Sequence, residues 1–406
     1  MKKTFVKFCV LQASYWSFFA ALPAYITAYM LEKGMSASTL GILLAIQMGC
    51  AFAGSIFWGR YVDRNQASRK FFLIGVSSTA ILGILLFLFA GSIPVLFVLY
   101  PLFGFMMGPV ATTLDSWAIA VMHHVSAGAK SRTFGTLGYA FTMLLSGQII
   151  SRFGYRFVPY IAGAFILVAV LVALTQPEIE KQTSSQPSVT VKAGSKGSFK
   201  EILRSRRYLL LVAVVFFTGM AIGPINNMKV LVFESVGGDV SFLGWDAFIG
   251  CLIQSPFLIF SDKIRRIRSE HRLLLGGSAA LLYALLVFLA RAPFMVVLGT
   301  IFTNISFGLL FPTMREITEE SVSGDLRTTA NSIVDVAYGS VASMIASAWS
   351  GAVMESAGTG MMCSICMVLE VAALGFALVL VLFGKKKSVT DQPSDSNMTN
   401  VPCKAA

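Results

Sequence analysis

Two opposite charges lie in an apolar part of the chain, between Pro109 and Tyr139. Asp115 is near the end of one apolar run, and Arg132 begins the next run after a short polar link. Charges at membrane depth are costly, so they usually face a partner or a wet cavity. A guanidinium there could bind a carboxylate or a hydroxyl-rich solute through paired hydrogen bonds. The alternative is that both side chains reach water at the membrane boundary.

Other side chains extend this candidate site at helical spacing. Arg132, Thr136 and Tyr139 fall at i, i+4 and i+7, so they share one face of a helix. Gln12 and Trp16, in the first apolar run, are one helical turn apart on a broad polar and aromatic face. We expect these faces to line a cavity.

The same spacing recurs late in the chain, where Asn331, Asp335 and Tyr338 fall on one face. Asp335 lies well inside its apolar run, so it joins Asp115 as a candidate for reversible protonation, because burial favours the neutral form of a carboxyl group. The alternative for Asp335 is an ion pair with Arg315 or a position at the helix end.

Two further polar residues interrupt apolar runs. Asn227 follows Pro224, and a broken helix with polar side chains is tolerated only where protein or a cavity surrounds it. Asn227 is predicted to contact a solute; alternatively it only bonds carbonyl groups freed by Pro224. Glu370 lies within the last apolar run, where a structural pairing is favoured over proton coupling.

The composition is that of a membrane protein. Of the 406 residues, 56% are hydrophobic and 13% charged, with a mean hydropathy of +0.74, whereas soluble proteins carry about 25% charged residues. The net charge of +12 does not indicate nucleic acid, because the positive residues form short clusters between apolar runs, without a single basic stripe. The expected surroundings are a lipid bilayer, and the expected state is a monomer.

Apolar runs of about 20 residues, the length that crosses a bilayer, predict twelve transmembrane helices. They span residues 6–31, 38–61, 70–91, 93–121, 132–153, 157–175, 207–232, 240–261, 272–291, 293–318, 328–354 and 359–384. Positive residues are enriched in cytoplasmic loops. With both termini in the cytoplasm, the 32 lysines and arginines all fall on that side except Lys33, Arg152, Arg156, Lys229 and Arg291. The sequence therefore predicts a multi-pass protein of the cytoplasmic membrane.

A polar stretch divides these helices into two sets of six. We expect an N-terminal six-helix bundle at 1–176, a cytoplasmic linker at 177–206, a C-terminal six-helix bundle at 207–388 and a disordered cytoplasmic tail at 389–406. A shift of 199 residues carries Asp63 to Asp262 and Tyr139 to Tyr338. Internal repeats of this size, with a binding site between them, are typical of secondary transporters.

The loop after the second span reads Gly59-Arg-Tyr-Val-Asp63-Arg64, with a further base at Arg69. It resembles the signature loop of the major facilitator superfamily, which implies an all-α membrane protein of two six-helix bundles. Gly59 would let a neighbouring helix approach closely, and Asp63 could accept a hydrogen bond from Arg69 or cap the N-terminus of a neighbouring helix. These residues, with Asp262 in the second half, are predicted to gate the cytoplasmic side. A plain cluster of cytoplasmic charges is the alternative.

The run from Arg132 to Tyr139 resembles the fifth helix of the lactose permease branch of that superfamily, which includes disaccharide, nucleoside and phenylpropionate proton symporters. In that branch the matching arginine binds substrate, an aromatic ring stacks on it, and an acid on the preceding helix completes the site. The resemblance implies these roles for Arg132, Tyr139 and Asp115. A similar Gly-x-x-x-Glu-Ser-x-Gly turn surrounds Glu355.

The chain also departs from that branch. The histidine and glutamate used there for proton coupling on the tenth helix are missing from residues 301–308. The acid expected on the eighth helix falls near Cys251, with Asp246 more than a turn earlier. Lactose is therefore not the expected solute, and any proton coupling must use other acids.

Together these features predict a secondary active transporter that moves a small organic solute by alternating access, with proton-coupled uptake. The alternative is an exporter of drugs or metabolites with the same fold, working as a proton antiporter. An enzyme is not expected, because no metalloprotease, phosphate-loop or nucleophile motif is present. No cofactor or metal is expected. The candidate substrate-binding residues are Arg132, Tyr139, Asp115, Thr136, Trp16, Gln12, Asn227 and Tyr338.

Overall fold

The computed structural model describes residues 2–65, 67–123, 125–178, 204–259, 266–322 and 326–390. Throughout these ranges the chain is helical apart from short links, and they contain no β-strand. The all-α fold is confirmed. Most of the predicted linker and most of the predicted tail lie outside the described residues, so both stay predictions.

The first half of the chain contains two broken spans. Its helices are α1 (Lys2–Ala21), α2 (Ile26–Glu32), α3 (Ala37–Asn65), α4 (Ser68–Leu88), α5 (Ile93–Met107), α6 (Val110–Met122), α7 (Val125–Phe153), the 3₁₀ turn η1 (Tyr155–Phe157) and α8 (Val158–Leu174). Pro23 lies in the break between α1 and α2, and Pro109 in the break between α5 and α6. Proline causes such breaks because it lacks a backbone donor and clashes with the preceding turn.

The second half is also interrupted. Its helices are α10 (Arg206–Asn227), α11 (Lys229–Ser235), α12 (Ser241–Ile259), α14 (Ser269–Phe288), α15 (Pro293–Ser321), α16 (Arg327–Asp335), the π-helical segment η3 (Val336–Val341) and α17 (Ala342–Thr390). Gly358, with φ of 78°, separates the last two predicted spans inside α17. Glycine adopts this left-handed conformation without steric cost.

Nine helices of the described ranges are long and apolar enough to cross a membrane, judged by length and composition. One of them, Thr329–Leu382, contains two of the predicted spans. The two predicted spans that are not among the nine correspond to α7 and α12. Helix α7 is less apolar because it carries polar side chains such as Arg132 and Thr136 along its length.

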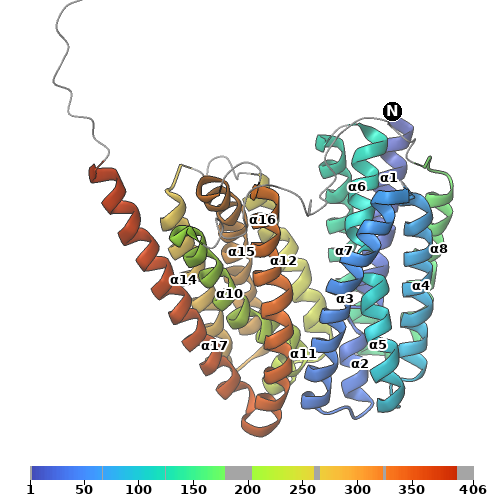
Figure 1. The fold of residues 1–406 in the computed structure, drawn as a ribbon. Helices are drawn as coiled ribbons and strands as arrows, with labels where there is room; N and C mark the ends of the chain where they lie inside the picture. Colours follow the sequence, from blue (N-terminus) through green and yellow to red (C-terminus); the bar gives the residue numbers. More distant parts are fainter. Residues whose placement is uncertain are drawn as a thin grey trace, which may run out of the picture.

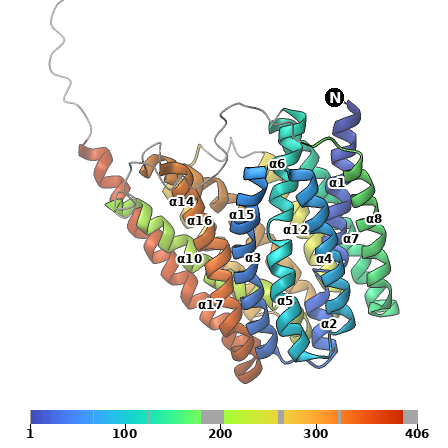
Figure 2. The ribbon, with the colours of Figure 1, turned by 45° about the vertical axis from the view of Figure 1, so that its right-hand side comes forward.

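The two halves form separate bundles that meet at one end (Figures 1 and 2). Each has an apolar core of its own, around Trp117 in the first half and Leu211 in the second. Helix α3 packs against α17, and α7 packs against α12. We call the end of the bundles that carries the N-terminus the N-terminal face, and the end that carries Lys33 the opposite face.

The halves touch closely toward the opposite face. A methyl group on Gly41 of α3 would lie 2.5 Å from the carbonyl oxygen of Ser347 in α17. One on Gly244 of α12 would lie 2.6 Å from the carbonyl oxygen of Met143 in α7. Small residues allow the backbones of membrane helices to approach in this way. The bundles are therefore sealed against each other at this end.

Candidate functional site

A cavity of about 1380 Å³ lies between the two halves. Its lining begins at Leu44 and Leu243, toward the opposite face, and ends at Gly59 and Arg60, near the N-terminal face. Because the bundles are sealed at the opposite face, the cavity opens toward the N-terminal face. Small-molecule pockets have volumes of about 300–1,000 Å³, so the cavity is large enough for an organic solute and water.

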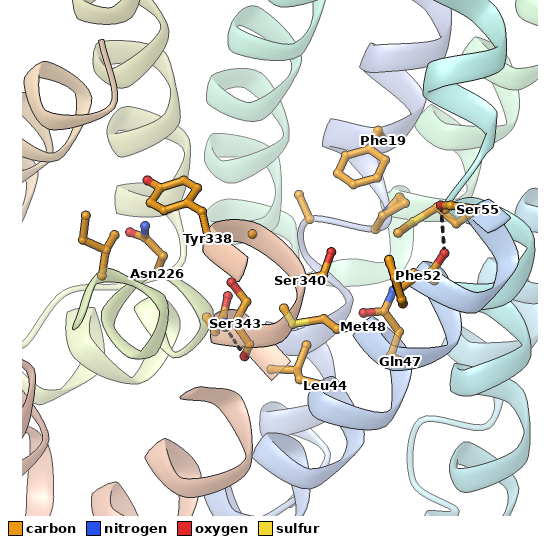
Figure 3. Close-up of a pocket in the computed structure, with 18 of the residues that line it drawn as sticks. Phe19, Leu44, Gln47, Met48, Phe52, Ser55, Asn226, Tyr338, Ser340 and Ser343 are labelled. Atoms are coloured by element: carbon orange, nitrogen blue, oxygen red, sulfur yellow. Dashed lines mark hydrogen bonds between the residues drawn. The ribbon is translucent and has the colours of Figure 1, made fainter. Parts of the chain in front are cut away.

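The cavity lining combines neutral polar, aromatic and aliphatic side chains, with few charges. Figure 3 shows Tyr338 and Asn226 facing it from the second half, and Phe19 and Gln47 from the first. Side-chain amides and aromatic rings recur around the wall: Gln47, Asn226, Asn227, Gln254 and Asn304 carry the amides, and Phe19, Phe52, Tyr100, Phe103, Tyr139, Phe307 and Tyr338 carry the rings. Such a wall can hydrogen-bond hydroxyl groups and stack on a ring.

Four predicted residues come together in the first half. The guanidinium of Arg132 forms an ion pair with Asp115 and lies 4.6 Å from the centre of the Trp16 ring. Gln12 donates a 2.8 Å hydrogen bond from Nε2 to Oδ1 of Asp115. Trp16 in turn donates from Nε1 to Oε1 of Gln12 at 3.2 Å. The side chains of Arg132 and Asp115 are 42% and 32% exposed, so this ion pair is not buried.

This network lies beside the cavity rather than in its wall. Its four members are not among the lining residues in the described part of the chain. Trp16 packs edge-on against Tyr139, with ring centres 6.3 Å apart, and also contacts Phe19. Tyr139 and Phe19 do line the cavity, so the network borders the cavity wall through Trp16. Thr136, half-buried on the same helix, is also outside the lining.

The predicted residues of the second half, Asn227 and Tyr338, both line the cavity. Asn227 donates a 2.7 Å hydrogen bond to the hydroxyl of Ser347 and a 3.5 Å bond to the carbonyl oxygen of Ser343. Both partners belong to α17, so this amide ties α10 to α17 rather than to carbonyls of its own helix. Tyr338 lies in η3, and π-helical turns are frequent at functional sites.

Asp335 lines the cavity and forms a 2.6 Å ion pair with Arg315 of α15. This is the pairing that the sequence left open as the alternative to a protonation switch. The two side chains are 42% and 35% exposed, so solvent screens the pair. A role for Asp335 in proton coupling stays a prediction.

Gly59 lies at the mouth of the cavity with open space around it. Among the residues that the structure describes, a methyl group there would meet nothing within 4 Å, so none of the described helices approaches it closely. Arg64 is exposed. The side chain of Asp63 and the whole of Asp262 lie outside the described residues. Their predicted gating roles therefore stay predictions.

Arg69 makes its described contacts with the segment after α8. Its guanidinium donates a 2.9 Å hydrogen bond to the carbonyl oxygen of Gln176, and its backbone N–H donates to Glu178 at 2.7 Å. Glu178 thereby caps the start of α4, where a carboxylate is favoured by the helix dipole. The segment that leaves the first bundle is thus fixed to the start of α4.

A second ion pair, absent from the sequence predictions, lies in the cavity wall itself. Lys229 at the start of α11 contacts Asp246 of α12, with 2.8 Å between Nζ and Oδ2. Thr300 of α15 donates its hydroxyl to the other carboxylate oxygen. The ionic side chains are only 12% and 9% exposed, and all three residues line the cavity.

From the sequence, Lys229 was expected among the charges of the opposite face, so its contact with Asp246 was not predicted. The sequence held a signal for this ion pair, because Lys229 and Asp246 are 17 residues apart, the same separation as Asp115 and Arg132. In both cases a turn joins two neighbouring helices that present opposite charges to each other.

Glu370 is completely buried on α17 and does not line the cavity. The hydroxyl of Thr218 on α10 donates a 3.1 Å hydrogen bond to Oε1 of Glu370. This geometry resembles the structural pairing that the sequence favoured over proton coupling. Which role it has stays a prediction.

Comparison with known proteins defines the class. Residues 8–389 match the MFS_1 like family, so the chain belongs to that family of MFS-type transporters. It is similar to the uncharacterized transporter YwbF of Bacillus subtilis (strain 168), with 21% identity over 89% of this chain and 90% of that protein. It is also similar to the maltose permease of Geobacillus stearothermophilus, with 23% identity over 91% and 92% of the two chains.

Solved structures share the fold. The nucleoside transporter NupG aligns with a TM-score of 0.74 at 16% sequence identity, covering 94% of this chain and 99% of the other. The predicted major facilitator fold is thereby confirmed. The chain is a multi-pass membrane protein and a secondary transporter, not an enzyme.

Proposed function

We propose that this transporter takes up a small organic solute across the cytoplasmic membrane together with protons, by alternating access. The observation that carries the proposal is the cavity of about 1380 Å³ between the halves, which is open at one face and sealed at the other. A cavity bounded by two bundles, with access from one side, is what alternating access requires. Its lining of amides, hydroxyls and rings suits a polar solute that contains a ring.

We assign the N-terminal face to the cytoplasm, because the loops on that side hold most of the lysines and arginines. Both termini would then be cytoplasmic. In the other state of the cycle, the bundles would separate at the opposite face and close at the N-terminal face. The open space around Gly59 would then accommodate a neighbouring helix.

The solute is proposed to contact residues from both halves. In the first half, Tyr139 and Phe19 already face the cavity. A shift of these two rings would admit solute to the network of Arg132, Asp115, Gln12 and Trp16. In the second half, Asn227 and Tyr338 face the same space. Similarity to a maltose permease and a nucleoside transporter supports uptake of a solute that carries hydroxyl groups or a ring.

The proposal can be tested on purified protein. A thermal-shift screen against sugars, nucleosides and aromatic acids should reveal solutes that raise the unfolding temperature, because a ligand stabilises the state that it binds. Proteoliposomes with an alkaline interior should then accumulate each such solute faster than proteoliposomes without a pH gradient. Equal accumulation with and without the gradient would contradict proton coupling.

Arg132→Ala should lose solute uptake while the protein remains folded in the membrane. Arg152→Ala is the matched control, because Arg152 lies on the same helix but at its exposed opposite end. Unchanged uptake by Arg132→Ala would remove this residue from the site.

A further inference from the structure

Lys229 and Asp246 form a salt bridge that is withdrawn from bulk water and yet faces the cavity. Desolvation of two ions costs several kcal/mol, and apolar residues of similar size often serve stability equally well. Ionisable residues in membrane spans mark functional positions more often than structural ones. The pair is therefore a candidate part of the transport site.

The surroundings of the pair contribute no further described charge in contact with it. Tyr283 of α14 faces Lys229, whose Nζ lies 5.6 Å from the ring centre. Tyr139 of α7 is the other titratable group near both Asp246 and Lys229; Cys251 of α12 lies near Tyr139, and Cys363 of α17 lies near Tyr283. Phenols and thiols are ordinarily uncharged at neutral pH. The cation and the carboxylate must therefore balance each other.

The remaining contacts hold the pair in place while leaving it open to the cavity. Thr300 bonds the second oxygen of Asp246, and Nζ of Lys229 lies 3.4 Å from the hydroxyl of Thr300. Tyr283 donates a 2.9 Å hydrogen bond to Asn226, which also lines the cavity. These polar contacts position both ions against the space that a solute would occupy.

Charge balance restricts what this site can accept. A proton on Asp246 alone would leave Lys229 as an uncompensated, nearly buried cation. An anion on Lys229 alone would leave two negative groups beside one positive group. Either event by itself is costly at low dielectric. When both occur together, the anion replaces Asp246 on Lys229, Asp246 becomes neutral, and the net charge of the site is unchanged.

We propose that Lys229 and Asp246 couple the entry of one proton to the binding of a solute with one negative charge, such as a carboxylate. The solute carboxylate binds Nζ of Lys229, and the proton binds the oxygen of Asp246 that Lys229 releases. A neutral solute gains nothing from this exchange. The inference rests on the proposed proton-coupled uptake and narrows its substrate to organic monoanions.

The test uses acids paired with uncharged analogues: benzoate with benzamide, gluconate with sorbitol, and glucuronate with glucose. Their binding to purified protein is measured by thermal shift between pH 6 and pH 9, where the acids remain ionised. We expect at least one acid to bind more tightly than its neutral partner, and its affinity to fall as the pH rises, because binding takes up a proton. Neutral solutes that bind as well as every acid would overturn the inference.

Three variants separate a coupling role from a structural one. Lys229→Met should lose the preference for the acid, a loss of about tenfold or more in affinity, the size of one charge-assisted contact. Asp246→Asn should bind the acid with an affinity that no longer changes with pH, and its uptake should no longer respond to a pH gradient. Lys229→Arg, which keeps the charge, should retain the preference. A pH-dependent affinity in Asp246→Asn would overturn the assignment, since a purely structural pair would leave the pH profile in place.

Uptake distinguishes failure of this inference from failure of the proposed function. Proteoliposomes with an alkaline interior that accumulate sorbitol, glucose or benzamide but none of the three acids would retain proton-coupled uptake and reject the monoanion. If none of the six solutes binds or accumulates in the native protein, the monoanion inference is rejected for this site as well. If an acid accumulates without regard to the pH gradient, the proposed proton coupling fails along with the inference.

Discussion

The backbone N–H of Ser38, at the start of α3, donates a 2.8 Å hydrogen bond to the carboxylate of Glu355 in α17. The bond joins the two halves at the opposite face, where a carboxylate at a helix N-terminus is favoured by the unpaired N–H groups. A few residues away, a methyl group on Gly351 would overlap the carbonyl oxygen of Ala37. Closure of this face thus depends on polar contacts such as this one and on close helix packing.

The first prediction concerns this packing. Gly351→Leu should prevent α3 and α17 from closing, because the added side chain has no space beside Ala37. The cavity should then become accessible from the opposite face, which can be measured as labelling of a cavity cysteine by a membrane-impermeant maleimide. Gly375→Leu is the control, since a methyl group there meets nothing within 4 Å. Equal labelling in both variants would contradict the role of this contact.

A second prediction concerns Asp239, in the link between α11 and α12. Ser151 of α7 and Ser241 both donate hydrogen bonds to its carboxylate, the latter at 2.5 Å. Partial burial raises the pKa of Asp239, but these bonds and backbone N–H groups outweigh that effect and hold the pKa below its ordinary 3.8. A depressed pKa means that the carboxylate stabilises closure above about pH 4 and loses this effect as the pH falls through the lowered value.

Ser151→Ala removes the part of this contact that joins the halves. Because Asp239 is exposed, we expect this substitution to destabilise the closed state by less than about 1 kcal/mol. At neutral pH, labelling of the cavity cysteine from the opposite face should therefore increase at most severalfold. Ser235→Ala is the matched control, since that hydroxyl bonds only Val232 of its own helix. The difference between native protein and Ser151→Ala should vanish at strongly acidic pH. A difference that grows on acidification would reject the assigned sign.

The third prediction separates Glu370 from transport. Glu370→Gln should retain uptake, because the side chain is fully buried away from the cavity. Thr218→Val should lower the free energy of unfolding by about 1–3 kcal/mol, since it leaves a buried carboxyl oxygen without its donor. Thermal unfolding in detergent measures the stability, with Ser364→Ala as control, because that hydroxyl bonds the carbonyl oxygen of Gly360 in its own helix. Loss of uptake in Glu370→Gln at native stability would instead indicate a coupling role.

The fourth prediction compares two carboxylates in the same cavity. Asp335→Asn should leave proton-driven uptake in place and cost less than about 1 kcal/mol of stability, because the pair with Arg315 is partly exposed. Asp246→Asn should abolish proton-driven uptake. The opposite pattern would return the proton to Asp335, one of the two candidates from the sequence.

Much of this architecture could be predicted from the sequence, because apolar length and the distribution of positive charges determine spans and their direction. Pro224 indicated the break between α10 and α11, whereas the breaks at Pro23 and Pro109 were not predicted. The charges at Asp115 and Arg132 indicated a contact between neighbouring helices. The pairing of Lys229 with Asp246 was missed because Lys229 lies at a helix break, where an amine could reach either water or a cavity. The π-helical segment around Tyr338 has no comparable sequence signal.

The central claim is a cavity between two bundles that is reached from one side at a time. Ser340→Cys, in a variant with the six native cysteines replaced by alanine, places one thiol in the cavity wall. In the absence of solute, a membrane-impermeant maleimide should label it in inside-out vesicles and not in right-side-out vesicles. Labelling from outside alone, or from neither side, would contradict this account.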